Sequence, residues 1–323
     1  MSARMGCVIV TYNSTEHIMD CLDSLAAANN VALRVVVVDN ASTDSSARVV
    51  QNWAARHELD LRLIQAPTNG GFAAGVNLGL RALMLDDTLD RFWILNPDCT
   101  APPGTPAALA NAPLPFSLLG CRIAYAKPSS QIQIDGGRIN RWTGATHNLN
   151  IGKDADETAL PKGEDLDFIS GASMVASRAF LEHAGLMPEQ YFLYYEEVDW
   201  AQRRGHLPLA ICENAHVYHS AGASIGSPTL DRGPSPVSAY FKHRARMMYM
   251  AAHHPWRLPV AYAFGWGKVL QHLCRRQHAP VPATLRALHM LKPNQAVSAA
   301  ISPAPTRSPE AALPDRHNAD CAP

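Results

Sequence analysis

Four short apolar runs, separated by segments with helical periodicity, constrain the fold of this chain more than any other feature. The runs lie at residues 6–10, 34–40, 61–65 and 91–95. They are apolar at consecutive positions, which is typical of strands covered on both faces. Between the first two runs, Ile18, Leu22 and Leu25 recur at helical spacing. The alternation predicts an α/β fold with a mostly parallel sheet flanked by helices.

Polar or small residues follow each of these runs. We take them as candidate ligand-binding residues: Thr11, Tyr12, Asn13, Asp39, Asn69, Gly70, Gly71, Phe72, Asn77, Asn96 and Asp98. Because the carboxyl ends of parallel strands meet at one edge of a sheet, these residues can converge on a single ligand. Each group alone is an ordinary turn or helix cap, but together they indicate a binding site.

The ligand is not held by either of the common phosphate-binding loops. The segment after the first strand, GCVIVTYNS, lacks GxGxxG, and no GxxxxGK[ST] motif occurs in the chain. The fourth strand ends at Asn96-Pro97-Asp98, where the proline stops the strand and a carboxylate follows at once. Asp39 can accept a hydrogen bond from a pyrimidine base. Asp98 can hold Mg²⁺ or Mn²⁺ against a diphosphate.

An ordered set of motifs resembles the family 2 glycosyltransferases of the GT-A fold, and within them the rhamnosyltransferase-like branch. The motifs are VIVTYNS, VVVVDNASTD, NGGFAAGVNLGL, LNPDC, DFISGASMVASRAF, YYEEVDWAQRRG and HVYHSAGAS, over roughly residues 6–250. The resemblance implies that Asp98 is a metal ligand, that Asp39 contacts the base, and that residues 69–72 wrap the ribose and diphosphate. It also implies that His219 is a second metal ligand; a partly buried structural histidine is the alternative.

The motif YYEEVDW carries three acidic residues, Glu196, Glu197 and Asp199. An acceptor hydroxyl is a poor nucleophile, so a carboxylate must take its proton during attack on the anomeric carbon. In the family the base is usually an Asp, and Glu197 stands at that position here. We expect Glu197 to be the base, with Asp199 as the alternative and Glu196 assisting. Such a site catalyses a single displacement with inversion.

The resemblance implies an inverting, metal-dependent glycosyltransferase of cell-surface polysaccharide biosynthesis. The expected donor is dTDP-L-rhamnose and the expected acceptor is a hydroxyl of a glycan or glycolipid. Galactofuranose, glucose or an amino sugar from a UDP donor remain alternatives. A nucleotidyltransferase of similar fold and a non-catalytic sugar-nucleotide-binding homologue are alternative functions, although TYNSTEH offers no lysine or arginine for a triphosphate.

Charged residues are distributed differently in two parts of the chain. Residues 1–231 carry 16 Lys/Arg and 25 Asp/Glu, whereas residues 232–292 carry 10 Lys/Arg and no acid. We expect a catalytic domain at 1–232 (nucleotide-sugar-binding half 1–100, acceptor half 101–232), a basic amphipathic helical extension at 233–292 and a disordered tail at 293–323. Residues 237–277 suit a membrane surface or pack on the catalytic domain to complete the acceptor site. No motif supports nucleic-acid binding.

Cysteine usage indicates a reducing compartment. The seven cysteines show no CxxC motif and no paired spacing, and the chain begins without a signal peptide. No run of 18 or more apolar residues occurs. The expected location is therefore cytoplasmic, or peripheral on the inner face of the cell membrane.

Overall fold

The computed structural model describes residues 3–220 and 233–301, and its first half is the predicted parallel sheet. The strands are β1 (Ala3–Thr11), β2 (Val31–Asp39), β3 (Asp60–Gln65) and β4 (Arg91–Leu95). They are ordered β3-β2-β1-β4. Thr11 pairs with Asp39, which in turn pairs with Gln65, so the strands end level with one another. Their carboxyl ends form the common edge that the sequence predicted.

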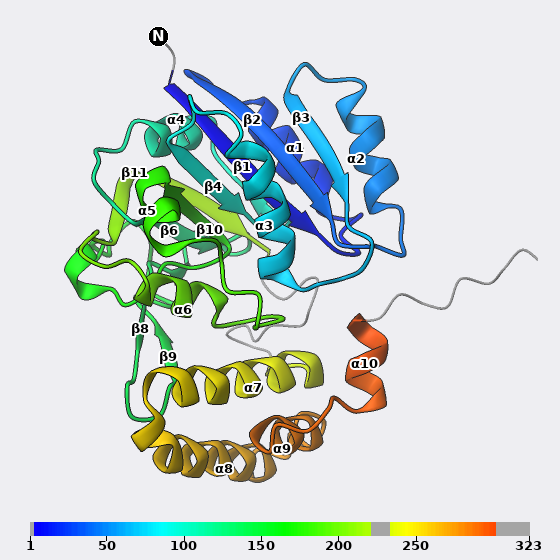
Figure 1. Ribbon diagram of the computed structural model, residues 1–323, viewed down its shortest axis with the longest axis vertical. Coiled ribbons are helices and arrows are strands. Elements are labelled where there is room, and N and C mark those ends of the chain that lie inside the picture. Colours follow the sequence, from blue (N-terminus) through cyan, green and yellow to red (C-terminus); the bar gives the residue numbers. More distant parts are fainter. Residues whose placement is uncertain (1–2, 221–232, 302–323) are drawn as a thin grey trace, which may run out of the picture.

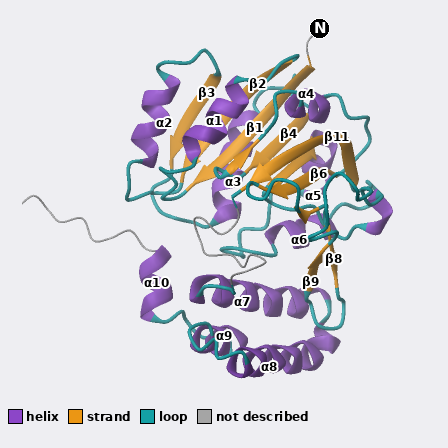
Figure 2. Cartoon of the chain, turned by 180° about the vertical axis from the view of Figure 1, so that it is seen from behind, coloured by secondary structure: helices purple, strands orange, loops and turns teal. Residues whose placement is uncertain are grey.

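Helices cover both faces of this half-sheet. They are α1 (Ile18–Ala26), α2 (Ser46–Ala54) and α3 (Phe72–Leu83). The chain steps outward from β1 to β3 and then returns past β1 to β4. With right-handed crossovers, this reversal puts α3 on the face opposite α1 and α2 (Figures 1 and 2). Ile18, Leu22 and Leu25 are buried against the sheet, as their spacing predicted.

The second half continues the same sheet with mixed strand directions. Its elements are β5 (Cys99–Thr100), α4 (Thr105–Ala110), β6 (Leu118–Tyr125), β7 (Ile132–Ile134), β8 (Gly137–Ile139), β9 (Thr146–Asn148), a 3₁₀ turn (Gly163–Asp165), β10 (Ser173–Ser177), α5 (Arg178–Ala184), α6 (Glu196–Gln202) and β11 (Ala210–His219). Strand β10 lies antiparallel between β4 and β6. Strand β11 lies parallel to β6 and antiparallel to β5, while β8 and β9 form a separate hairpin.

The C-terminal helices of the predicted fold are present and form a layer below α6 (Figure 1). They are α7 (Pro236–His253), a 3₁₀ turn (Pro255–Arg257), α8 (Leu258–Cys274), α9 (Val281–Leu288) and α10 (Gln295–Ile301). None of the helices in the described ranges has the length and apolar character needed to span a membrane. The predicted domain boundary at residue 232 lies outside the described residues.

The prediction of a disordered tail from residue 293 is wrong for α10. Val297 of this short helix is fully buried in a small cluster with Tyr240, Phe241, Ala283 and Ala287. The composition of residues 293–323, which are rich in alanine, proline and serine, did not indicate this contact. The contact is made by one valine side chain and depends on tertiary packing. Residues 302–323 lie outside the described residues.

Candidate active site

A cavity of about 310 Å³ lies at the carboxyl edge of the parallel strands. Seven of the residues singled out in the sequence line it: Tyr12, Asn69, Gly71, Phe72, Asn96, Asp98 and His219. They come from the ends of β1, β4 and β11 and from the loop that leads into α3. The convergence predicted from strand ends is therefore present for these residues.

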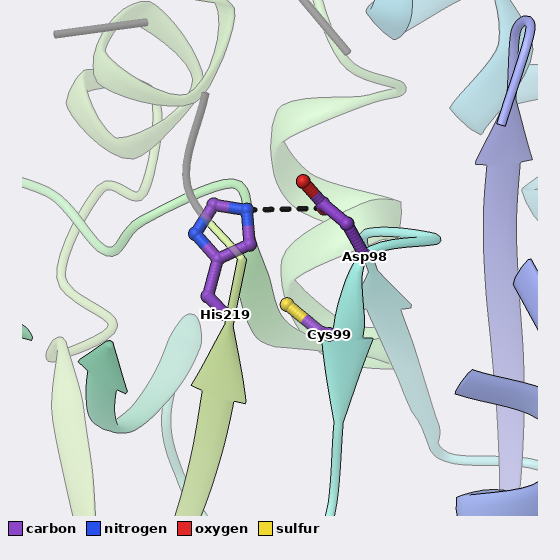
Figure 3. Close-up of side chains that lie close together, drawn as sticks. All are labelled: Asp98, Cys99 and His219. Carbon is purple, nitrogen blue, oxygen red and sulfur yellow. Dashed lines mark hydrogen bonds and ion pairs between the residues drawn. The ribbon is translucent and has the colours of Figure 1, made fainter. Parts of the chain in front are cut away.

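Asp98 and His219 form a close pair at this cavity (Figure 3). His219 Nε2 lies 3.1 Å from Asp98 Oδ1, and both side chains are largely buried. Pairing of His219 with Cys99 between β11 and β5 brings them together, and Ser220 N donates to the Asp98 carbonyl. Two residues 121 positions apart are thus fixed side by side by backbone hydrogen bonds.

The donor atoms of this pair fit a hard divalent ion. A carboxylate oxygen and an imidazole nitrogen at adjacent corners of an octahedron, with bonds of about 2.1 Å, would stand roughly 3 Å apart. This matches the observed separation. Gln133 Oε1 lies 2.8 Å from His219 Nδ1, so Nδ1 can donate there and leave Nε2 as a ligand.

Cys99 lies close enough to count as a third possible ligand, and Figure 3 shows it below the pair. Its Sγ lies 3.4 Å from the Ala172 carbonyl. Burial, together with the nearby Asp98 carboxylate, raises the pKa of the Cys99 thiol well above its ordinary value. Because Mg²⁺ and Mn²⁺ prefer oxygen ligands to soft thiolate sulfur, Asp98 and His219 are the candidate ligands for either of these ions.

Asp39 has a free carboxylate oxygen beside the cavity-lining Asn40. Its Oδ2 accepts from Ser42 N at 3.2 Å, whereas its Oδ1 is buried and has no hydrogen-bond partner. A buried acceptor left unpaired is costly, and a bound donor group would satisfy it. The geometry suits the predicted contact with an N–H group of a nucleotide base.

The loop into α3 is held in place by Gly71. This residue has φ +89°, and a Cβ there would lie 2.3 Å from the Phe192 carbonyl oxygen. Asn40 Nδ2 donates to the Gly71 carbonyl at 2.8 Å, and Phe72 N donates to Phe192 O at 3.0 Å. The loop into α3 and the segment before α6 are therefore in direct backbone contact.

Two consecutive tyrosines introduce the acidic motif in an unusual backbone conformation. Tyr194 and Tyr195 have φ of 68° and 72°. Bulky residues rarely adopt this left-handed region, and such strain clusters at functional sites. The turn starts α6 at Glu196, so all three acids lie in the first helical turn.

The three carboxylates have different surroundings. Asp199, 1% exposed, lies 3.1 Å from His253 Nε2 and 3.2 Å from Arg203 Nε, and it also accepts from Gln190. Glu196 is buried with its Oε2 unpaired. Glu197 is half-buried. Burial raises the pKa of Glu197 to about 7, while the Lys242 ammonium acts in the opposite direction. Burial and the Glu197 charge raise the pKa of Glu196 as well.

Asn77 and Asn13 do not line the cavity. Asn77 is buried, and its side-chain amide donates to the Met187 carbonyl and to Glu189 while its Oδ1 accepts from Met187 N. It therefore anchors the loop before α6 and is not free to contact a donor, so the predicted binding role is wrong. Asn13 uses its Oδ1 to hold the backbone of residues 43–44.

The remaining predicted residues do not line the cavity. They are Thr11, Gly70 and the three carboxylates of α6. The loop that precedes these carboxylates does line the cavity, through Phe192 and Leu193.

Several lining residues were not predicted as site residues: Ser14, Phe192, Leu193, Val237, Ala300 and Ile301. Phe192 and Leu193 adjoin the YYEE motif, so adjacency to a motif could have indicated them. Nothing in the local sequence of α7 or α10 indicates Val237, Ala300 or Ile301, because only tertiary packing brings these helices to the cavity.

The chain is similar in sequence to known glycosyltransferases. The model of Glycosyl transferase family 2 matches residues 7–112. The N-acetylglucosaminyl-diphospho-decaprenol L-rhamnosyltransferase of Mycobacterium tuberculosis (strain CDC 1551 / Oshkosh) is 26% identical over 317 residues. That alignment covers 88% of this chain and 95% of the relative.

Solved structures share the fold. The mannosyltransferase PcManGT from Pyrobaculum calidifontis, in complex with GDP-Man and Mn²⁺, aligns with a TM-score of 0.54 at 17% identity over 90% of this chain and 87% of its own. The S. aureus TarS 1–349 complex with UDP-GlcNAc aligns with a TM-score of 0.53 at 17% identity over 92% and 84%. These likenesses confirm the predicted fold class.

Proposed function

The chain is a family 2 glycosyltransferase of the GT-A fold, and from that premise we propose that it transfers L-rhamnose from dTDP-L-rhamnose to a hydroxyl of a lipid-linked glycan, with inversion, in cell-surface polysaccharide biosynthesis. The observation that carries the proposal is the 3.1 Å pair of Asp98 and His219 at the cavity where the parallel strands end. The rhamnosyl donor and the lipid-linked acceptor are the chemistry named for the Mycobacterium tuberculosis relative.

Asp98 and His219 would hold Mg²⁺ or Mn²⁺ against the donor diphosphate. When bound, the ion supplies positive charge that stabilises the departing nucleotide diphosphate. Asp39 Oδ1, which lacks a partner, would accept from N3–H of thymine. Uracil presents the same donor, so UDP sugars are the alternative donors. Tyr12, Asn69, Gly71 and Phe72 would enclose the ribose and diphosphate.

Glu197 would act as the base. Its carboxylate removes the acceptor proton as the acceptor oxygen attacks the anomeric carbon, and the bond from that carbon to the diphosphate oxygen breaks. Asp199 is a poor alternative because three neighbouring side chains already occupy its carboxylate. The raised pKa of Glu197 makes it a stronger base than an exposed glutamate.

Calorimetric titration tests the donor site. We would titrate dTDP, UDP and GDP, each with and without Mn²⁺ or Mg²⁺, into wild type, Asp98→Ala and the exposed control Asp87→Ala. The proposal expects dTDP to bind only with metal, and binding to be lost in Asp98→Ala but kept in the control. Absence of binding for every nucleotide in wild type would contradict it.

We also propose contact with an anionic membrane surface through α8. The predicted amphipathic helix in α7 does not serve this role, because Tyr240, Phe241 and Arg246 are buried. Instead α8 and the turn before it expose apolar side chains, with Trp256 95% and Leu270 61% exposed. Ten Lys/Arg and no acid in residues 232–292 favour anionic lipid.

Vesicle co-sedimentation tests the membrane contact. Wild type should bind vesicles that contain phosphatidylglycerol more than neutral vesicles, and a Trp256→Ser, Leu270→Ser double variant should lose most of this binding. Equal recovery of wild type and the double variant with the vesicles would refute the role of α8.

A further inference from the structure

A group of five basic side chains lies between α7 and α8, apart from the metal pair. This basic cluster consists of Lys242, His243 and Arg246 from α7 and Lys268 and His272 from α8. Neither helix contains an acidic residue. Two positively charged helix faces in contact repel each other, so the arrangement calls for a negative partner.

Arg246 is the most buried member, at 2% exposed. Its Nη1 donates to the Thr143 and Ala261 carbonyls at 2.7 and 2.8 Å, while its Nε and Nη2 have no partner. Its guanidinium lies 5.2 Å from the centre of the Phe264 ring. A buried guanidinium with two unpaired nitrogen donors is costly unless an anion completes its hydrogen bonds.

Three of the other members, Lys242, His243 and Lys268, are partly exposed, whereas His272 is buried. Lys268 Nζ lies 5.3 Å from the same Phe264 ring, so two cations share one aromatic side chain. His243 Nδ1 is buried and unpaired. Burial, followed by the charges of the other four members, lowers the pKa of His243 to about 3, which keeps this ring neutral. Lys242, His243 and Lys268 are each partly exposed, so the cluster is open to solvent on one side.

The cluster adjoins the acceptor side of the proposed active site. Lys242 is close enough to Glu197 for each charge to influence the other. Tyr195, which precedes the acidic residues, donates its hydroxyl to the Gly144 carbonyl next to the Arg246 side chain. The donor diphosphate has its own site at Asp98 and His219, at the edge of the sheet. An anion at the cluster would therefore belong to the molecule that Glu197 deprotonates.

We propose that the basic cluster binds a phosphate or diphosphate group of the acceptor, adjacent to the sugar that is glycosylated. The inference rests on the proposed function, since it places a second substrate at a glycosyltransferase site. Arg246 supplies two free donors and Lys242 and Lys268 supply charge, which is the combination that recognises phosphoryl oxygens. Either a lipid-linked diphosphate or a soluble sugar phosphate carries this chemistry.

Inorganic diphosphate in EDTA is the first probe, because removal of divalent ions separates this site from the donor site. Lys242→Gln, Lys268→Gln is the test variant, and Arg244→Gln on α7, outside the cluster, is the matched control. Arg246 is left unchanged because it also ties residue 143 to α8. We expect calorimetry to show diphosphate binding to wild type and the control, and at least tenfold weaker binding to the double variant.

The outcomes separate the two proposals. If dTDP with Mn²⁺ still binds the double variant as it binds wild type, the donor site is intact and the loss belongs to the cluster. If diphosphate does not bind in EDTA, or binds wild type and the double variant equally, the cluster proposal is overturned while the donor site stands. Tighter binding of a short prenyl diphosphate than of inorganic diphosphate would identify a lipid-linked acceptor. Equal binding would identify a soluble one.

Discussion

Glu197 is the residue on which the proposed reaction depends most. We predict that Glu197→Gln lowers kcat by about 10²- to 10⁴-fold, because the amide cannot accept a proton. Binding of dTDP with Mn²⁺ should be unchanged, since Asp98, His219 and Asp39 remain. The measurement is initial-rate kinetics beside nucleotide calorimetry.

Asp199→Asn provides the contrast to this variant. It should lower the melting temperature by weakening the contacts to Arg203 and His253, with a smaller effect on kcat in the protein that remains folded. If Glu197→Gln stayed active and Asp199→Asn folded but was inactive, Asp199 would be the base and Glu197 would not.

The raised pKa of Glu197 gives a second prediction at this scale. A base must be ionised, and burial holds the pKa near 7. Below pH 7 the protonated fraction grows, so kcat/KM should fall about tenfold for each pH unit. Above pH 8 it should level off. A flat profile from pH 5.5 to 8 would contradict the assignment.

At the residue scale, the predictions that succeeded were those whose cause lies in neighbouring residues of the sequence. Pro97 ends β4, so the position of Asp98 could be inferred from three adjacent residues. Asn77 was assigned wrongly because its partners, Met187 and Glu189, lie 110 and 112 positions away. The sequence indicated the basic cluster only as an excess of positive charge, since the burial of its side chains depends on how α7 packs against α8.

At the element scale, strands β1 to β4 could be predicted because each carries a continuous apolar run between turn residues. Strand β10 and the two-residue β5 could not be placed, because their positions depend on partners that are remote in the sequence. The insertion of β10 between β4 and β6 is set by the whole sheet and by no pattern within residues 173–177.

Helix α10 offers a test at the same scale. Its Val297 is fully buried, and Ala300 and Ile301 line the cavity. Val297→Asp should release the helix, since burial of a valine contributes about 1.5–3 kcal/mol. We expect a several-fold increase in donor KM with little change in melting temperature. The exposed neighbour Ala296→Asp is the control, and equal KM values for both variants would exclude a role for α10 in donor binding.

At the scale of the whole molecule, one hydrophobic core spans the sheet and the C-terminal layer. The ring of Tyr195 lies 5.8 Å from that of Tyr249, and Phe192 stacks on Phe241 at 4.7 Å. The different charge of residues 1–231 and 232–292 suggested a separable C-terminal extension. Composition does not show that these helices pack against the catalytic domain in one core.

This shared core predicts a single cooperative unfolding transition in scanning calorimetry. A chain truncated after residue 234 should be insoluble or lack a native transition, because Tyr195 and Asp199 lose their contacts with Tyr249 and His253 of α7. Two resolved transitions, or a stably folded chain that ends at residue 234, would show that the C-terminal layer is an independent unit.

The position of β11 between β6 and β5 has a consequence for how the protein matures on the ribosome. Strand β5 pairs only with β11 among the strands of the described sheet, and Asp98 lies immediately before it. Asp98 therefore leaves the ribosome well before its partner histidine, and residues 99–100 stay unpaired until residues 218–219 have been synthesised. The parallel half can form early from contacts close in sequence, but the ion-binding pair is completed late in folding.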